Sequence, residues 1–307
     1  MNMPTDLNFD PMTLELDPLL KRLHLANARK VWKDLADRCD TEGKSCREFF
    51  AILIAREIGH RAQTRLQRAV DNADFPYLKT IDDFDFSLQP VLRPQLLGPY
   101  LGPELVTEGR NLILKGKTGR GKTMLAIAIA YRAIQNGYTA RFVTAAQLID
   151  DLSAASQQGQ LRKALSEYVH PSVLVIDEIG YLTHGPDAAN VLFHVVNERH
   201  IKRKPMIFTT NKSPMTQWGD VLHDHDLAAT IVDRTLERGR LLILEGPSYR
   251  TRHLPELADA QQAGQEPARV SGKRRPEFPE PASAGGRLSG QMLQYYSIVC
   301  ERSRPRM

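Results

Sequence analysis

The chain has 307 residues, of which 42% are hydrophobic and 25% are charged, and its net charge is +5. These values are ordinary for a soluble globular protein of one large or two smaller domains, and the mild basic excess permits a nucleic-acid partner without establishing one. No apolar run approaches the ~18 residues of a membrane span, so we expect no membrane partner. Three cysteines without any C-x-x-C pair argue against a disulfide framework and a zinc ribbon, which favours a cytoplasmic protein.

The N-terminal region predicts a small all-α domain over residues 19–71, preceded by a disordered acidic segment, residues 1–18. A first helix is expected from Leu19 to about Arg38, because a typical Asp-Pro helix start precedes it. The run Ser45-Cys46-Arg47-Glu48 is a capping box, which opens a second helix.

The second helix carries a basic stripe at helical spacing, formed by Arg61, Arg65 and Arg68. Residues 19–70 contain twelve Lys/Arg against six Asp/Glu, an excess larger than that of the whole chain. The stripe fits contact with the phosphate backbone of double-stranded DNA, and it equally fits an ordinary solvated helix face. We therefore name the three arginines as candidate DNA contacts and keep both interpretations.

Residues 72–95 are expected to form a linker, because prolines interrupt them. The aromatic and acidic run Phe84-Asp85-Phe86 within it is expected to pack on the next domain, and contact with an adenine ring is the alternative. Over residues 96–254 apolar strands alternate with helices, a pattern typical of a parallel sheet flanked by helices. Residues 255–307 are rich in Pro, Gly, Ser and charge, so we expect a mostly disordered tail.

A glycine-rich run with the spacing G-x-x-x-x-G-K-T lies between an apolar strand and a helix, as in a phosphate-binding P-loop. Its members are Gly116, Lys117, Thr118, Gly119, Arg120, Gly121, Lys122 and Thr123. The glycines let backbone N–H groups surround an anion at the positive end of the new helix. Lys122 would reach the β- and γ-phosphates of ATP, and the hydroxyl of Thr123 would ligate Mg²⁺. The spacing and context favour this interpretation over a chance glycine-rich turn.

A second strand, residues 172–176, is continuously apolar and ends in Asp177 and Glu178. Ligands of an open parallel sheet bind at the carboxyl ends of its strands, so both acids are expected beside the P-loop. Asp177 would hold Mg²⁺ and Glu178 would polarise the attacking water. The alternative, two acids at a solvent-exposed strand end, is less favoured after a P-loop at this distance.

Three further side chains are candidates for the phosphate chemistry. Asn211 ends another apolar strand and would orient the attacking water, although its surroundings also fit a simple turn. Arg234 and Arg250 are candidates for stabilising the transferred phosphoryl group, one of them from a neighbouring subunit. Spacing alone does not choose them over Arg238 or Arg240.

Two polar runs indicate a function less clearly than these motifs. The run His223-Asp224-His225-Asp226 superficially resembles a metal cluster, but a polar loop leading to a helix cap fits it better. The basic run from Arg199 to Lys204 either contacts DNA or complements the negative end of the helix that it terminates.

The basic helices, the P-loop and four later motifs follow one another in a familiar order over residues 19–254. The later motifs are Val-Leu-Val-Ile-Asp-Glu-Ile-Gly-Tyr, Ile-Phe-Thr-Thr-Asn-Lys, Val-Asp-Arg-Thr-Leu and Gly-Pro-Ser-Tyr-Arg. The order resembles that of the IstB-type helper ATPases of bacterial insertion sequences, relatives of the DnaC helicase loaders in the AAA+ superfamily. The resemblance implies that Asn211 is sensor 1, Arg234 the arginine finger of the adjacent protomer's site, and Arg250 sensor 2.

The resemblance also implies a function: an AAA+ ATPase that forms a homo-oligomer on double-stranded DNA and stimulates a partner transposase. A helicase loader that shares the same ATPase is the nearest alternative. A monomeric small-molecule P-loop kinase and a nucleotide-binding protein without turnover are the others. The expected fold is an AAA+ P-loop domain between an all-α N-terminal domain and a disordered tail.

Overall fold

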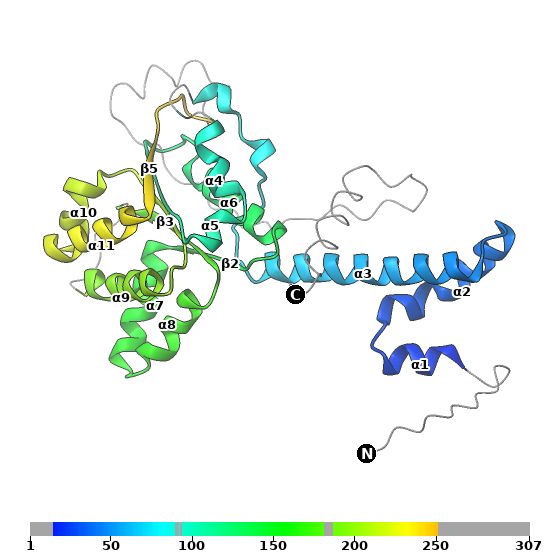
Figure 1. The fold of residues 1–307 in the computed structure, drawn as a ribbon. Helices are drawn as coiled ribbons and strands as arrows, with labels where there is room; N and C mark the ends of the chain where they lie inside the picture. The colour runs from blue at the N-terminus through cyan, green and yellow to red at the C-terminus, as the bar shows by residue number, and fades with distance from the viewer. Residues whose placement is uncertain (1–14, 90–91, 93, 181–186, 251–307) are drawn as a thin grey trace, which may run out of the picture. The chain divides into compact units, whose positions relative to one another are not determined.

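The computed structural model describes residues 15–89, 92, 94–180 and 187–250 (Figure 1). Of the segments predicted to be disordered, residues 1–14 and 255–307 lie outside the described residues, whereas residues 16–18 belong to a helix. Within the described part of the chain, no helix combines the length and the apolar character that a membrane crossing requires.

The N-terminal domain contains three helices, α1 (Leu16–Arg22), α2 (Ala26–Thr41) and α3 (Cys46–Asp71). The prediction of one helix from Leu19 to Arg38 was wrong, because the chain breaks at His24, whose φ is 55°. The predicted capping box is confirmed: Ser45 N donates to Glu48 Oε2 at 2.9 Å, and Glu48 N donates to Ser45 Oγ at 3.3 Å. Side chains of all three helices form one small core, which includes Leu20, Leu35 and Leu53.

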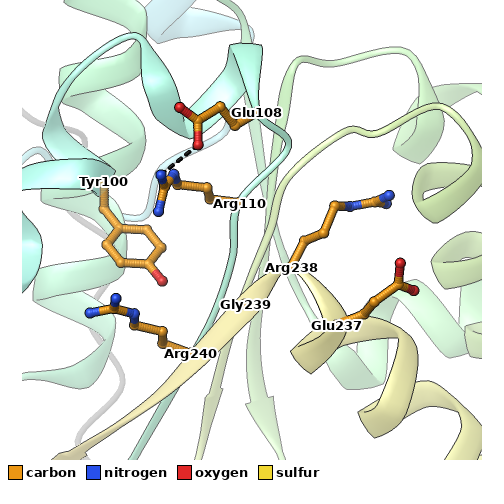
Figure 2. Close-up of a pocket in the computed structure, with 7 residues that line it drawn as sticks. All are labelled: Tyr100, Glu108, Arg110, Glu237, Arg238, Gly239 and Arg240. Carbon is orange, nitrogen blue, oxygen red and sulfur yellow. Dashed lines mark ion pairs between the residues drawn. The ribbon is translucent and has the colours of Figure 1, made fainter.

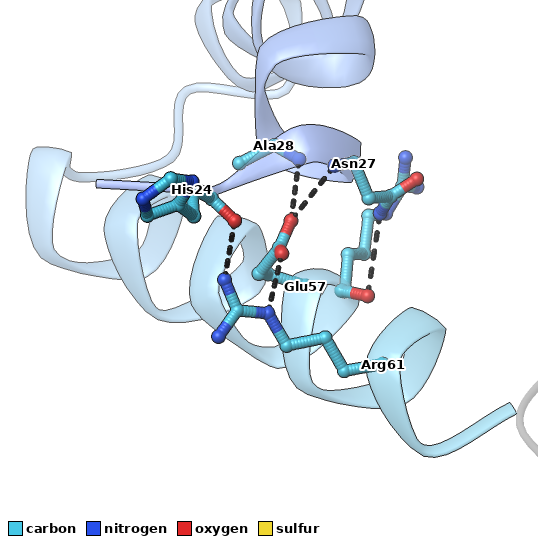
Figure 3. A network of polar contacts seen from close by, with 6 residues as sticks. His24, Asn27, Ala28, Glu57 and Arg61 are labelled. Atoms are coloured by element: carbon cyan, nitrogen blue, oxygen red, sulfur yellow. Dashed lines mark hydrogen bonds and ion pairs between the residues drawn. The ribbon is translucent and has the colours of Figure 1, made fainter. Parts of the chain in front are cut away.

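A buried carboxylate of α3 explains the break between α1 and α2 (Figure 3). Glu57, with only 3% of its surface exposed, accepts hydrogen bonds from the backbone N–H groups of Asn27 at 2.9 Å and Ala28 at 2.8 Å. It thus satisfies two of the unpaired N–H groups at the start of α2, where the negative charge is also favoured. Burial raises the pKa of Glu57, but the hydrogen bonds from Ala28 and Arg61 outweigh it and hold the pKa below its ordinary value.

Arg61 belongs to this same network. Its Nε donates to Glu57 Oε1 at 2.8 Å, and its Nη2 donates to the carbonyl oxygen of His24 at 2.5 Å. Arg61 therefore joins α3 to the α1–α2 turn, whereas Arg65 and Arg68 lie exposed farther along α3. This network gives Arg61 a structural role that, within the described part of the chain, Arg65 and Arg68 do not share.

The second part of the described chain is a five-stranded parallel sheet in the order β2-β3-β4-β1-β5. The strands are β1 (Asn111–Gly116), β2 (Ala140–Thr144), β3 (Val173–Ile179), β4 (Met206–Thr210) and β5 (Gly239–Leu244). The 3₁₀ and short helices before β1 are η1 (Ile81–Asp83), η2 (Phe86–Leu88), η3 (Pro94–Leu97), α4 (Gly98–Leu101) and α5 (Glu104–Thr107). The helices between the strands are α6 (Lys122–Gln135), α7 (Ala145–Gln157), α8 (Leu161–Val169), α9 (Ala188–Ile201), α10 (Pro214–Leu222) and α11 (His225–Glu237). The predicted sheet flanked by helices is confirmed.

Both faces of the sheet are buried, which explains why its strands are continuously apolar. Successive side chains point to opposite faces, so Leu174 and Ile176 pack in one core while Val173 and Val175 pack in the other. The first core contains residues of α7 to α11, and the second contains residues of α4, α5 and α6. Figure 1 accordingly shows α9, α10 and α11 on one side of the sheet and α4 and α6 on the other.

The predicted basic run at the end of α9 is not a continuous surface patch. Arg199 is fully buried, and its guanidinium donates to four backbone carbonyl oxygens at 2.7–3.0 Å, those of Tyr168, Pro171, Ser172 and Pro205. Lys204 donates to the carbonyl oxygen of Val169 at 2.9 Å. The DNA-contact interpretation is therefore wrong for Arg199, because a side chain without exposed surface reaches no DNA.

The histidine-containing run before α11 is a helix cap, as expected. Asp224 Oδ1 accepts a hydrogen bond from the backbone N–H of Leu227 at 2.9 Å, which satisfies one free donor of the first turn. The described residues contain no group of three or more acidic, histidine or cysteine side chains placed to hold a metal ion.

Candidate nucleotide-binding site

The P-loop connects the end of β1 to the start of α6, as its spacing predicts. Gly119 and Gly121 have φ values of 80° and 87°, a left-handed conformation that suits glycine. A Cβ at Gly116 would lie 2.6 Å from the carbonyl oxygen of Leu244 on β5, so the loop also needs glycine for this close approach. The N-terminus of α6 faces the loop, where backbone N–H groups and the helix dipole favour an anion.

Lys122 is the first residue of α6 and is 6% exposed. Its Nζ donates to the carbonyl oxygen of Lys117 at 3.0 Å, which holds the ammonium group against the loop. Burial lowers the pKa of Lys122 to about 8, and the nearby charges of Asp177 and Glu178 oppose this effect. A bound phosphate would add negative charge beside this desolvated ammonium group and would favour its charged form.

The pKa of Lys122 gives a prediction for the pH dependence of nucleotide affinity. Bound phosphates favour the charged ammonium and return its pKa toward the ordinary value, so binding takes up a proton once the pH exceeds about 8. We expect the Kd for ATP, measured by calorimetry, to rise about tenfold between pH 7.5 and pH 9. In Lys122→Arg, whose guanidinium does not titrate there, affinity should stay nearly constant; the same tenfold change in that variant would contradict the assignment to Lys122.

The hydroxyl of Thr123 and the carboxylate of Asp177 lie together beside the loop. Thr123 Oγ1 is 3.0 Å from Asp177 Oδ1 and 3.1 Å from Oδ2, and Thr209 Oγ1 of β4 donates to Oδ1. Burial raises the pKa of Asp177, whereas the hydrogen bonds from Thr209 and Thr123 lower it. Hydroxyl and carboxylate oxygens are the ligands that Mg²⁺ prefers, so these residues fit that ion.

Glu178 follows Asp177 at an irregular point of β3. The pairing of β3 with β4 shifts between Ile176 and Ile179, and Glu178 has a φ of 63°. Its backbone N–H donates to Thr209 Oγ1 at 2.9 Å, while its side chain is exposed. Thr209 thus contacts both acidic residues: its hydroxyl donates to the Asp177 carboxylate, and its oxygen accepts from the Glu178 backbone N–H.

Asn211 directly follows β4, the strand that lies between β1 and β3. The carboxyl end of β4, which Asn211 follows, therefore lies between the ends of the P-loop strand and the strand of Asp177. Its Oδ1 is buried and has no hydrogen-bond partner among the described residues. A buried acceptor without a partner is stabilised when it receives a hydrogen bond, for example from a water molecule beside the phosphates.

The two candidate arginines lie in different places. Arg250 is exposed, and its positive charge contributes to the lowered pKa of Lys122, which puts it near the P-loop. Arg234 of α11 instead contacts α9: its guanidinium lies 4.7 Å from the ring centroid of Phe193 and donates to Asn197 Oδ1. The described contacts of Arg234 are therefore with the helical layer and not with the P-loop of its own chain.

Gln89, which lies outside the predicted motifs, and the Gly-Pro-Ser-Tyr-Arg motif together fix the position of the P-loop. Gln89 Nε2 donates to the carbonyl oxygen of Arg120 at 3.0 Å, and its Oε1 accepts from Gly246 N at 3.2 Å. The backbone N–H of Tyr249 donates to the carbonyl oxygen of Gly119 at 2.8 Å. No motif marks Gln89, since its role depends on two segments that are distant in the sequence.

The aromatic residues of the predicted linker pack against this loop. Phe84 is 4% exposed, its ring centroid is 5.6 Å from that of Tyr249, and its side chain would lie 2.9 Å from a Cβ at Gly121. This confirms the expected docking contact for Phe84. Burial raises the pKa of Tyr77, and the charge of Asp177 acts in the same direction, so this linker residue also lies near the site.

Three features at one edge of the sheet define the class of protein to which this chain belongs. They are a P-loop at the end of β1, an acidic pair at the end of β3 and an asparagine at the end of β4, the strand between them. The chain is a P-loop nucleotide-binding protein with a five-stranded parallel sheet in the order β2-β3-β4-β1-β5. A family model described as IstB-like ATP binding protein matches residues 18–256. The chain belongs to this family of IstB-like ATP-binding proteins.

Individual relatives agree with this assignment. An insertion sequence IS5376 ATP-binding protein from Geobacillus stearothermophilus is 38% identical over 75% of this chain and 91% of its own length. The corresponding insertion sequence IS21 protein from Pseudomonas aeruginosa is 33% identical over 77% of this chain and 88% of its own. Among solved structures, the DnaC helicase loader aligns with 49% of this chain and 86% of its own, at 23% identity and a TM-score of 0.43.

Proposed function

We propose that this protein hydrolyses Mg²⁺-ATP, oligomerises on double-stranded DNA and stimulates the transposase of an insertion sequence. The observation that carries the proposal is the convergence of Lys122, Thr123 and Asp177, with Glu178 adjacent, in a member of the IstB-like family. The relatives that share most of its length are ATP-binding proteins of insertion sequences, which supports the role in transposition.

Each residue has a distinct task in hydrolysis. Lys122 and the P-loop N–H groups bind the phosphates, and Thr123 with Asp177 holds Mg²⁺, which neutralises phosphate charge when bound. Glu178, whose carboxylate is exposed, accepts a proton from the attacking water. Asn211 orients that water through its buried amide oxygen.

The two arginines complete the site from different chains. Arg250 lies near Lys122 and contacts the phosphates within one protomer. Arg234 is half-buried on the α9–α11 layer and reaches the nucleotide of the next protomer, where its guanidinium stabilises the transferred phosphoryl group. ATP binding then promotes assembly, since each nucleotide contacts two subunits.

We assign the binding of DNA to α3, and this assignment is tested by removing two positive charges from that helix. Arg65 and Arg68 are both exposed, and among the residues that the structure describes neither has a contact comparable to that of Arg61. We expect the double variant Arg65→Ala/Arg68→Ala to bind a mixed-sequence 60-base-pair duplex at least about tenfold more weakly at 100 mM salt. The slope of log affinity against log salt concentration should fall by about 1.8, because two phosphate contacts are lost.

A variant with the same loss of charge elsewhere, Arg162→Ala/Lys163→Ala on exposed positions of α8, serves as the control. An equal salt slope in the α3 variant and the wild type would contradict the assignment to α3.

ATP turnover is measured on all three proteins with and without the duplex. DNA-independent turnover by a strict monomer, with phosphoryl transfer to a metabolite, would support a small-molecule kinase instead. Capture of a replicative helicase but of no transposase would support a helicase loader.

A further inference from the structure

An arginine-rich pocket of about 250 Å³ lies at the opposite end of β1 and β5 from the P-loop (Figure 2). It is formed where Arg110 leads into β1 and where Arg238 and Arg240 flank the first residue of β5. Because β1 has six residues, the pocket and the nucleotide site are separated by about 16 Å along this strand. The nucleotide chemistry described above uses none of these side chains.

The three guanidinium groups differ in how many hydrogen bonds and ion pairs they form with neighbouring residues. Arg238 Nη2 donates to the carbonyl oxygen of His200 at 2.6 Å, and Arg110 Nη2 pairs with Glu108 Oε2 at 2.5 Å. Arg240 is exposed, and its guanidinium has no ion pair or hydrogen bond with another residue of the described ranges, while its backbone belongs to the β1–β5 ladder. Arg240 therefore has donor capacity for an added anion, while the other two are oriented by their neighbours.

Tyr100 adds a hydroxyl group to the same hollow. Its ring is buried, at 2% exposure, and Figure 2 shows its oxygen pointing between Arg110 and Arg240. Burial raises the pKa of Tyr100, and the positive charges of Arg240 and Arg110 lower it, so both cations are close to the phenol. The group stays protonated at neutral pH and is a hydrogen-bond donor.

Asn111 and Gly239 hold together the strand starts that carry the arginines of the pocket. Asn111 is 1% exposed, and its side chain donates to the carbonyl oxygen of Thr235 at 3.0 Å and accepts from Met206 N at 2.9 Å. Gly239 is required between the two arginines, because a Cβ there would lie 2.4 Å from the Thr235 carbonyl oxygen. A frame held together in this way lowers the entropy cost of orienting guanidinium groups for a ligand.

The pocket continues into a basic surface. The loop after α9 contributes exposed Lys202 and Arg203, and Arg203 lies against the 108–110 turn, where a Cβ at Gly109 would be 2.4 Å from its carbonyl oxygen. The acidic residues at this end are each paired with a cation or a histidine: Glu108 with Arg110 at 2.5 Å, Glu198 with Lys202 at 2.9 Å and Glu237 with His200 at 3.3 Å.

We propose that this pocket binds a phosphate of the DNA backbone, with Arg240, Arg110 and Tyr100 as donors. Guanidinium groups bind phosphate through paired N–H donors, and several cations in succession suit a chain of phosphates. A protein partner is less favoured, because the lining is polar apart from the buried ring of Tyr100, whereas the centre of a protein interface is usually apolar. The inference rests on the proposed DNA-dependent function and adds a contact of the ATPase domain to those of α3.

The test compares three single variants of the full-length protein in binding to the same 60-base-pair duplex over 50–250 mM salt. Arg240→Ala should bind about tenfold more weakly, and its salt slope should fall by about 0.9, because one charged phosphate contact is lost. Tyr100→Phe keeps the ring but loses the donor, so affinity should fall about threefold with an unchanged slope. Arg162→Ala, on α8, should retain the wild-type affinity.

Three results would overturn the proposal in distinguishable ways. If the wild type binds the duplex and Arg240→Ala has the same affinity and salt slope, the pocket is not a phosphate site although the proposed function stands. Loss of a co-purified transposase in Arg240→Ala, with DNA binding intact, would assign the pocket to a protein carboxylate instead. If the wild type itself does not bind duplex DNA, the proposed function fails, and the inference fails with it.

Discussion

Glu178→Gln should bind ATP with nearly unchanged affinity and hydrolyse it at least about 100-fold more slowly than the wild type. The amide retains the size of the carboxylate but cannot accept a proton from water. Because the Thr123 hydroxyl and the Asp177 carboxylate contact each other directly, we expect the predicted Mg²⁺ ligands to remain in place. Single-turnover phosphate release measures the rate, and equilibrium binding of a fluorescent ATP analogue measures the affinity.

The matched control is Glu104→Gln, which makes the same chemical change at an exposed position of α5. It should hydrolyse ATP at the wild-type rate. A Glu178→Gln protein with unchanged turnover would show that the protein uses another base or that it binds nucleotide without turnover. A large loss of affinity in Glu178→Gln would instead indicate that the residue holds the bound nucleotide.

Arg199→Ala should lower the free energy of unfolding by about 3–5 kcal/mol, one of the largest effects expected of a single substitution here. The buried guanidinium donates to the carbonyl oxygens of Tyr168, Pro171, Ser172 and Pro205. Its removal leaves buried acceptors without donors and opens a cavity beside the start of β3. Urea unfolding followed by circular dichroism should show a lower midpoint with an unchanged m-value.

Arg162→Ala provides the comparison, because it removes an exposed arginine from a neighbouring helix and should change stability by less than about 0.5 kcal/mol. An Arg199→Ala protein destabilised by less than about 1 kcal/mol would mean that other donors replace the guanidinium. DNA binding by the folded fraction of Arg199→Ala should equal that of the wild type, since the side chain has no exposed surface.

Much of the ATPase fold and of its site follows from local sequence patterns. A parallel strand that is buried on both faces must be continuously apolar, so the strands ending at Gly116 and Thr210 are recognisable without a structure. The P-loop is equally local, because glycine spacing and the following helix create its geometry within eight residues. Asp177 and Glu178 are predictable from their position at a strand end, and the structure places Asp177 against Thr123.

Contacts between distant segments were not predictable. His24 breaks the first predicted helix because Glu57, from another helix, satisfies the N–H groups of Asn27 and Ala28. In the sequence, Arg199 resembles an exposed charge within a basic run. It is buried only because α8, α9 and the segments that lead into β3 and β4 pack around it.

The sequence by itself determined the phosphate-binding loop, the acidic pair and the class of sheet, because each depends on side-chain chemistry at short spacing. Only the tertiary structure decided which charges are buried and which are exposed. Arg61 and Arg199 are both part of basic runs, yet one joins two helices and the other fills a cluster of carbonyl oxygens. Arg240 is the opposite case: it belongs to no motif, and the pairing of β1 with β5 brings it beside Arg110 and Tyr100. The physical reason is that desolvation and hydrogen bonding depend on neighbours in space, which chain order does not specify.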